Sequence, residues 1–64
     1  MQINAMELTI DSRFSFFEGG TVYGVVDLDE CDGVMTIEYL NGDTASHGTA
    51  DMYLDDTLWL VSRD

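Results

Sequence analysis

The sequence predicts an all-β domain, a small five-stranded barrel with one short helical or 3-10 turn before the last strand. Three observations predict it. Apolar residues recur at every second position in several stretches, no stretch keeps the 3.6-residue period of a helix, and Asn41-Gly42, a strong hairpin signal, follows one of these stretches. A sheet this small leaves its edge strands exposed unless it curls, so we expect the strands to close into a barrel.

The predicted strands follow one another with short connections in a single domain, 1–64. The apolar residues Met6, Leu8 and Ile10 alternate with polar ones, which is typical of a strand buried on one face. Residues 50–57 show no clear alternation and are expected to form the helical or 3-10 turn. The five predicted strands are 6–11, 21–28, 33–40, 43–49 and 58–63.

The charge of the chain is its most unusual property. Thirteen Asp and Glu residues face two Arg and no Lys, which gives a formal net charge of -11. Such a charge is typical of disorder, but 45% of the residues are hydrophobic, so we expect a folded domain. Its surface should repel DNA, RNA and anionic lipid, which excludes direct binding to nucleic acid or to a membrane as a function.

The compartment is predicted from what the sequence lacks. No apolar run approaches the roughly 18 residues that span a bilayer, and the first ten residues do not have the basic and apolar regions of a signal peptide. Cys31 is the single cysteine, so an internal disulfide is excluded, while pairing with another chain stays open. We expect a cytoplasmic protein, either a monomer or a dimer.

The order of these parts resembles the SH3-like barrel, the architecture shared by SH3 and Tudor-type modules. The resemblance covers roughly residues 5–62 and is carried by "VYGVVDLDECDGVMTIEYLNGDTASHGTADMYL", in which an acidic connection and a tight hairpin join strands. The end of this segment, "GTADMYL", is similar to the SH3 segment in which a glycine precedes a one-turn helix bearing a tyrosine. The SH3 proline and the Tudor aspartate-tyrosine pair are missing, so neither polyproline nor methyl-lysine recognition is implied.

The resemblance also implies where a binding site lies. In such barrels the first long loop, the "DLDECDG" connection and the turn before the last strand gather at one end and flank the binding groove. Phe17 and Tyr53 are candidate apolar anchors there. The residues expected to contact a partner are Glu18, Asp27, Asp29, Glu30, Asp32, Asp51, Tyr53, Asp55 and Asp56.

A calcium loop is the main alternative interpretation of "DLDECDG". An EF-hand loop needs acidic ligands at positions 1, 3 and 5, glycine at 6 and glutamate at 12. Counting from Asp27, positions 1, 3 and 12 fit, but position 5 is Cys31 and the glycine comes one residue late. The flanking segments are also predicted strands rather than helices. We therefore expect an acidic connection between strands and no specific metal site.

Catalysis is not expected. His47 is the only histidine, and a Cys31-His47 dyad would require these residues to meet in space. No glycine-rich phosphate loop or paired CxxC motif is present, and a barrel of this size has no deep pocket, so we expect no enzymatic activity and no cofactor. Six aromatic residues are expected to pack in or beside the core: Phe14, Phe16, Phe17, Tyr23, Tyr39 and Trp59.

Two classes of function remain. The first is an inhibitor or regulator whose acidic surface occupies a basic, nucleic-acid-binding surface of a partner protein, as a nucleic-acid mimic; a phage or mobile element is the kind of source we expect for it. The second is a generic SH3-like structural or interaction domain whose acids only keep it hydrated, as in proteins of salt-loving organisms. Measuring folding as a function of salt concentration distinguishes the two classes, because a halophilic domain should lose structure in dilute buffer.

Overall fold

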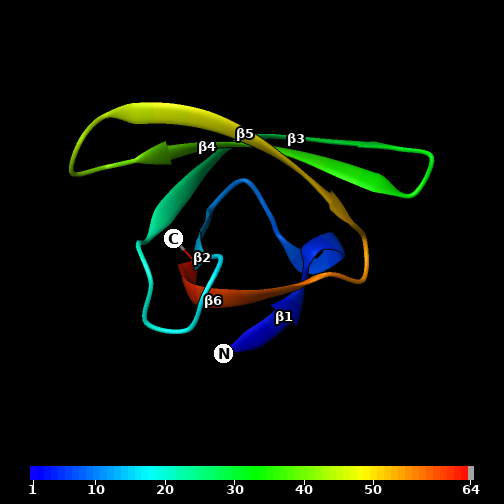
Figure 1. The fold of residues 1–64 in the computed structure, drawn as a ribbon, viewed down its shortest axis with the longest axis horizontal. Coiled ribbons are helices and arrows are strands. Elements are labelled where there is room, and N and C mark those ends of the chain that lie inside the picture. Colours follow the sequence, from blue (N-terminus) through cyan, green and yellow to red (C-terminus); the bar gives the residue numbers. More distant parts are fainter. Residues whose placement is uncertain (64) are drawn as a thin grey trace.

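The computed structural model describes residues 1–63 and confirms the all-β class (Figure 1). One antiparallel sheet has the strand order β1-β6-β2-β3-β4-β5, and a single 3-10 turn, η1, follows β1. The elements are β1 (Gln2–Asn4), η1 (Ala5–Glu7), β2 (Ser12–Ser15), β3 (Tyr23–Cys31), β4 (Val34–Asn41), β5 (Ser46–Tyr53) and β6 (Thr57–Arg63).

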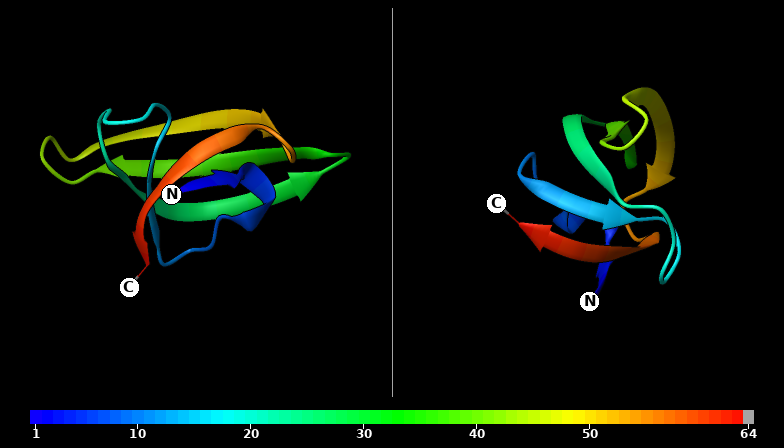
Figure 2. Two further views of the ribbon diagram at one scale, coloured as in Figure 1. Left: turned by 90° about the horizontal axis from the view of Figure 1, so that it is seen from below. Right: turned by 90° about the vertical axis from the view of Figure 1, so that its left-hand side faces the viewer.

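The sheet bends into two layers (Figures 1 and 2). β3, β4 and β5 form one layer, β1, β6 and β2 form the other, and β3 passes between them because its first residues, Tyr23 and Gly24, pair with β2. The register between β3 and β4 shifts between Val25 and Asp27, a bulge that increases the local twist. Within residues 1–63, β1 pairs only with β6 and β5 only with β4, so the two edge strands do not pair with each other. The expected five-stranded closed barrel is therefore not confirmed, since the sheet has six strands and stays open.

The core lies between the two layers. Ile3, Ala5, Leu8, Phe14, Met35, Ile37 and Leu58 are its buried hydrophobic residues. Phe14 also contacts Phe16, Tyr23 and Tyr39, with ring centroids 5.2 to 6.4 Å apart in edge or tilted orientations. Such aromatic pairs stabilise a fold by about 0.5–1.5 kcal/mol each beyond their buried area. The prediction that these four aromatics pack in or beside the core is confirmed.

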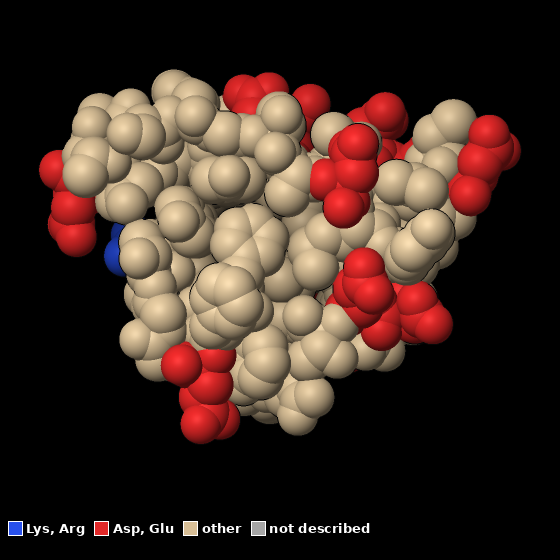
Figure 3. Space-filling model, in the orientation of Figure 1, with Lys and Arg blue, Asp and Glu red and all other residues tan. Residues whose placement is uncertain are grey.

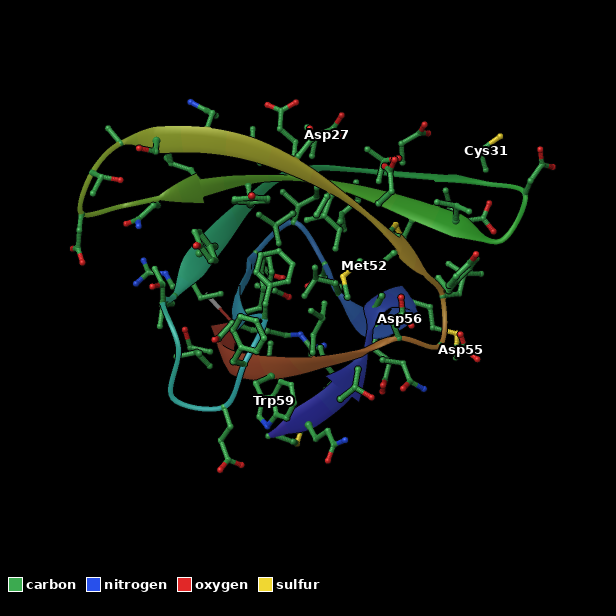
Figure 4. All side chains as sticks on the ribbon, in the orientation of Figure 1. Asp27, Cys31, Met52, Asp55, Asp56 and Trp59 are labelled. Atoms are coloured by element: carbon green, nitrogen blue, oxygen red, sulfur yellow. The ribbon has the colours of Figure 1, made fainter. Side chains whose placement is uncertain are left out.

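Two aromatics predicted for the core lie elsewhere. Phe17 is 74% exposed in the connection between β2 and β3. Trp59 projects from β6 away from the core (Figure 4), because it alternates with Leu58 and Leu60, which face inward.

The predicted strand at residues 6–11 is wrong. β1 ends at Asn4, and the chain enters η1, where the Glu7 carboxylate accepts a hydrogen bond from the Asn4 N–H at 2.7 Å. A second local turn follows, in which the Ser12 N–H donates to the Thr9 carbonyl at 3.0 Å. These local hydrogen bonds compete with strand pairing.

The two hairpin turns differ from the prediction. Asn41 ends β4 and pairs with Ser46, so four residues connect β4 to β5 and the positive φ of 56° falls on Ala45. The two-residue turn is Asp32-Gly33, with φ of 54° and 80°, as a type I′ turn requires. Most of "DLDECDG" is therefore strand rather than loop. The predicted helical turn at 50–57 is also wrong, because β5 continues to residue 53 and a short turn joins it to β6.

Candidate functional site

The outward side of the β3-β4-β5 layer carries a group of carboxylates. Side chains alternate along a strand, and Leu28, Met35, Ile37 and Met52 pack on the core. The residues between them point outward in two cross-strand rows: Asp27, Glu38 and Thr49 in one, and Asp29, Thr36 and Asp51 in the other. We call Asp27, Asp29, Glu38 and Asp51 the outer acidic face.

The carboxylates of the outer acidic face are close enough to repel one another. Asp27 and Glu38 are direct cross-strand partners, and Asp29 follows Asp27 by two residues, about 6.8 Å along the strand. Both separations are shorter than the Debye length of about 8 Å at physiological salt. The three strands that carry these acids contain no Lys or Arg.

Asp51 is held in place by a neighbour. The Thr36 hydroxyl, directly across from it on β4, donates a hydrogen bond to Asp51 Oδ1 at 2.7 Å. A carboxylate on a paired strand, fixed by such a bond, loses little conformational freedom when it binds a cation.

A shallow hollow of about 340 Å³ lies at the end of β5. Its lining is Val34, Asp51, Met52, Tyr53 and Asp56. The Asp56 carboxylate accepts a hydrogen bond from the Tyr53 N–H at 2.9 Å, and the Tyr53 side chain is 65% exposed. Two carboxylates beside an exposed ring and aliphatic groups suit a Lys or Arg side chain, whose stem is apolar and whose head is charged.

A second hollow, of about 560 Å³, lies over β2, β3 and β4 near the turn between β4 and β5. It is lined by Arg13, Thr21, Val22, Gly24, Leu40, Asn41, Gly42 and Asp43. One arginine and one aspartate give this lining no net charge, so it does not extend the outer acidic face.

The predicted contact residues fall into three places. Asp27, Asp29 and Asp51 belong to the outer acidic face, and Tyr53 and Asp56 line the hollow of β5, with Asp55 beside them on the turn to β6 (Figure 4). Asp32 lies in the turn between β3 and β4, and Glu30 lies near the end of β3 just before it. This turn is joined to the end of β5 by the Leu54 N–H, which donates to the Gly33 carbonyl at 3.3 Å. Two of the three expected segments therefore meet.

Glu18 lies apart from the others. Its connection between β2 and β3 is at the left of Figure 1, opposite the β3-β4 turn at the right. Figure 3 shows carboxylates along the rim of the molecule and on the right-hand part of the face toward the reader, while the centre of this face is uncharged. Glu38, which the predicted set lacks, joins the outer acidic face because the bulge in β3 brings it opposite Asp27.

Cys31 and His47 do not form a catalytic pair. Their cross-strand partners on β4 are Val34 and Leu40, six positions or roughly 20 Å apart along the strand. Over residues 1–63, no three His, Cys, Asp or Glu side chains are grouped so that they could hold a metal ion. The same residues contain no helix of the length and apolarity that crossing a membrane requires.

No protein-family model matches this sequence, and neither curated proteins nor solved structures match it. The surface of the molecule itself is therefore the basis for a proposal on function.

Proposed function

We propose that this protein is a small acidic protein-binding module, an inhibitor or regulator that occupies the basic, nucleic-acid-binding surface of a partner protein. The outer acidic face is the observation that carries the proposal, because it sets four carboxylates on three adjacent strands that contain no Lys or Arg. In this role the carboxylates take the place of backbone phosphates, so the protein acts as a nucleic-acid mimic. We place this activity in the cytoplasm, with Cys31 reduced.

The arrangement of the acids favours a cationic partner. Like charges directly across a strand pair, such as Asp27 and Glu38, destabilise a sheet by roughly 0.2–1 kcal/mol. A Lys or Arg of the partner that approaches both carboxylates replaces this repulsion by attraction. Binding therefore relieves the repulsion between Asp27 and Glu38 that destabilises the isolated domain.

The net charge of the whole chain favours fast encounter. A charge of -11 attracts a basic surface over distances that the salt concentration limits. We expect the association rate to fall steeply as salt rises, because steering depends on unscreened charge.

The proposal is tested by capturing partners from a cell lysate at about 0.1 M and 1 M salt, with identification by mass spectrometry. We expect a basic nucleic-acid-binding protein that is bound at low salt, lost at high salt, and released when its own nucleic acid is added. Recovery of proteins without a basic surface, or binding that nucleic acid does not compete, contradicts the mimic.

Two variants of equal net charge locate the site. Asp27→Asn, Asp29→Asn and Glu38→Gln together neutralise three carboxylates of the outer acidic face and change the net charge from -11 to -8. The control variant, Asp11→Asn, Glu18→Gln and Asp43→Asn, makes the same change of net charge away from this face and from the hollow of β5. We expect the first to weaken capture by about tenfold or more and the control by about threefold or less. Equal losses in both would show that bulk charge, and not this face, attracts the partner.

The solubility alternative makes a different prediction from the same composition. Nine Asp, four Glu and no Lys resemble the usage of halophilic proteins, which lose structure in dilute buffer and recover it in molar KCl. Under our proposal the domain is folded in dilute buffer and in molar KCl. Circular dichroism spectra recorded in the two solutions test this.

A further inference from the structure

The strand β5 has one side without a partner. Within residues 1–63 it pairs only with β4, and it forms an outer edge of the sheet. The Leu54 N–H donates to Gly33 on the β4 side, and the hydrogen bonds of an antiparallel ladder alternate along the strand. Met52, Ala50 and Gly48 therefore direct their backbone groups to β4, while those of Asp51, Thr49 and His47 face away from it.

This edge lacks several of the usual protections against pairing, although it carries one charged residue, Asp51. β5 is eight residues long, contains no Lys or Pro, and pairs with β4 without a register shift. Natural edge strands are commonly shortened, bulged, or interrupted by Lys or Pro, because an open edge is a template for another strand. At one end the Asp56 carboxylate satisfies the Tyr53 N–H, so the open stretch runs from His47 to Asp51.

We propose that β5 binds an extended segment of the partner protein as an additional strand, and that this segment carries Lys or Arg at every second residue. The inference rests on the proposed function and specifies how the partner is held. Backbone hydrogen bonds to His47, Thr49 and Asp51 give the affinity, and the alternate side chains give the specificity.

Charge and burial on the two sides of β5 define the segment. On the outward side, Asp51 lies on the edge strand itself and Glu38 on the strand behind it, so basic side chains fit there. The hollow at Asp51, Tyr53 and Asp56 accepts the last of them. On the inward side, the neighbours are Ala50 and Met52, so small or apolar side chains fit there.

A second copy of this chain fits the edge poorly. Each copy has a net charge of -11, and antiparallel pairing of two β5 strands would bring two outer acidic faces together. Like charges set side by side in a sheet are destabilising. A basic segment is the complementary occupant.

The first test uses a capped peptide, Lys-Val-Lys-Val-Lys-Val-Lys, with the isotope-labelled protein at about 0.1 M salt. We expect amide hydrogen exchange at His47, Thr49 and Asp51 to slow by about tenfold or more at saturation, because these N–H groups become bonded. Two peptides with N-methyl groups on alternate residues serve as matched controls. The one methylated at the Lys positions and the one methylated at the Val positions should differ in affinity by about tenfold, since only one set of N–H groups points at β5.

The second test removes one edge donor from the protein. Thr49→Pro deletes an N–H that faces away from β4, so no ladder bond is lost, and proline is tolerated at such edge positions. Thr49→Val keeps the N–H and serves as the control. We expect the proline variant to bind the peptide about tenfold more weakly and the valine variant within about twofold of the parent. If Thr49→Pro does not fold, the methylated peptides decide the question with the protein unchanged.

The remaining outcomes overturn the inference in distinguishable ways. Peptide-induced shifts at Asp27, Asp29 and Glu38 without slower exchange at the β5 edge would show a segment lying across the outer acidic face, which refutes strand addition but leaves the proposed function intact. Absence of binding up to about 5 mM peptide also refutes the addition of a basic strand to β5. A dimer with protected edge amides and no peptide would assign the edge to a second copy. Failure of the proposed function itself shows instead as absence of any basic partner in the lysate capture.

Discussion

A single methyl group at Gly48 is expected to destabilise the fold. The Tyr39 ring lies across Gly48, its cross-strand partner, and a Cβ built on Gly48 would be 2.5 Å from Cζ and Oη of Tyr39. The ring has little room to move, because it contacts Tyr23, Phe16 and Phe14 at centroid distances of 4.7, 5.5 and 6.4 Å. Gly48→Ala therefore either displaces the ring or separates the strands.

The loss of stability in Gly48→Ala is the difference between the cost of the clash in the folded state and the gain from a less flexible unfolded chain. Overpacking costs about 1–3 kcal/mol, and disturbing an aromatic contact costs about 0.5–1.5 kcal/mol more. The lower entropy of the unfolded alanine chain offsets about 0.4–1 kcal/mol. We expect a net loss of about 0.5–4 kcal/mol in the free energy of unfolding, or a fall in Tm of about 4–8 °C for each kcal/mol.

Urea unfolding followed by the fluorescence of Trp59, the only tryptophan, measures this loss. Gly24→Ala is the control, since a Cβ there meets only the Leu40 carbonyl oxygen at 4.0 Å. In a Tyr39→Leu background, which lacks the clashing ring atoms, Gly48→Ala should cost at least about 1 kcal/mol less. An equal cost in both backgrounds, or no cost in either, would refute the assignment of the effect to the Tyr39 ring.

Two further predictions concern the turns and the outer acidic face. Gly33→Ala should destabilise the domain by about 1–2 kcal/mol, because Gly33 has a φ of 80°. Ala45→Gly should be neutral or stabilising by up to about 1 kcal/mol, because Ala45 has a φ of 56°. Equal effects of the two substitutions in thermal melts would contradict the turn geometry. Asp27→Asn should raise stability by about 0.2–1 kcal/mol at low salt by removing the repulsion with Glu38. This gain should shrink at about 1 M salt, where the Debye length is about 3 Å; a gain that is independent of salt would point to a cause other than charge.

The sequence predicts the central strands well because their alternation and their burial agree. In β4, Met35 and Ile37 are buried while Thr36 and Glu38 face outward, as the pattern indicates. The same pattern fails at residues 6–11. Of its three apolar residues only Leu8 is buried, and Met6 and Ile10 are more than half exposed, because the 3-10 turn and the Thr9-Ser12 turn use local hydrogen bonds that alternation does not reveal.

The sequence predicts the turns and the candidate site less well. Asn41-Gly42 and Asp32-Gly33 are both strong two-residue hairpin signals, but only the second has positive φ at both residues. The strand pairing decides between them, and register depends on the distant partner strand. The bulge near Val26 brings Glu38 opposite Asp27, and no local feature of the sequence marks it.

The order of the strands also bears on how the domain is assembled during folding. β3, β4 and β5 are consecutive and joined by connections of two and four residues, so their pairing closes only short loops. Pairing β1 with β6 brings Ile3 beside Leu58 across almost the whole chain, and this closure carries a larger entropy cost. We expect the three-stranded meander to form first and the terminal strands to dock on it later. The outer acidic face and the open edge of β5 then belong to the part of the chain that is structured first.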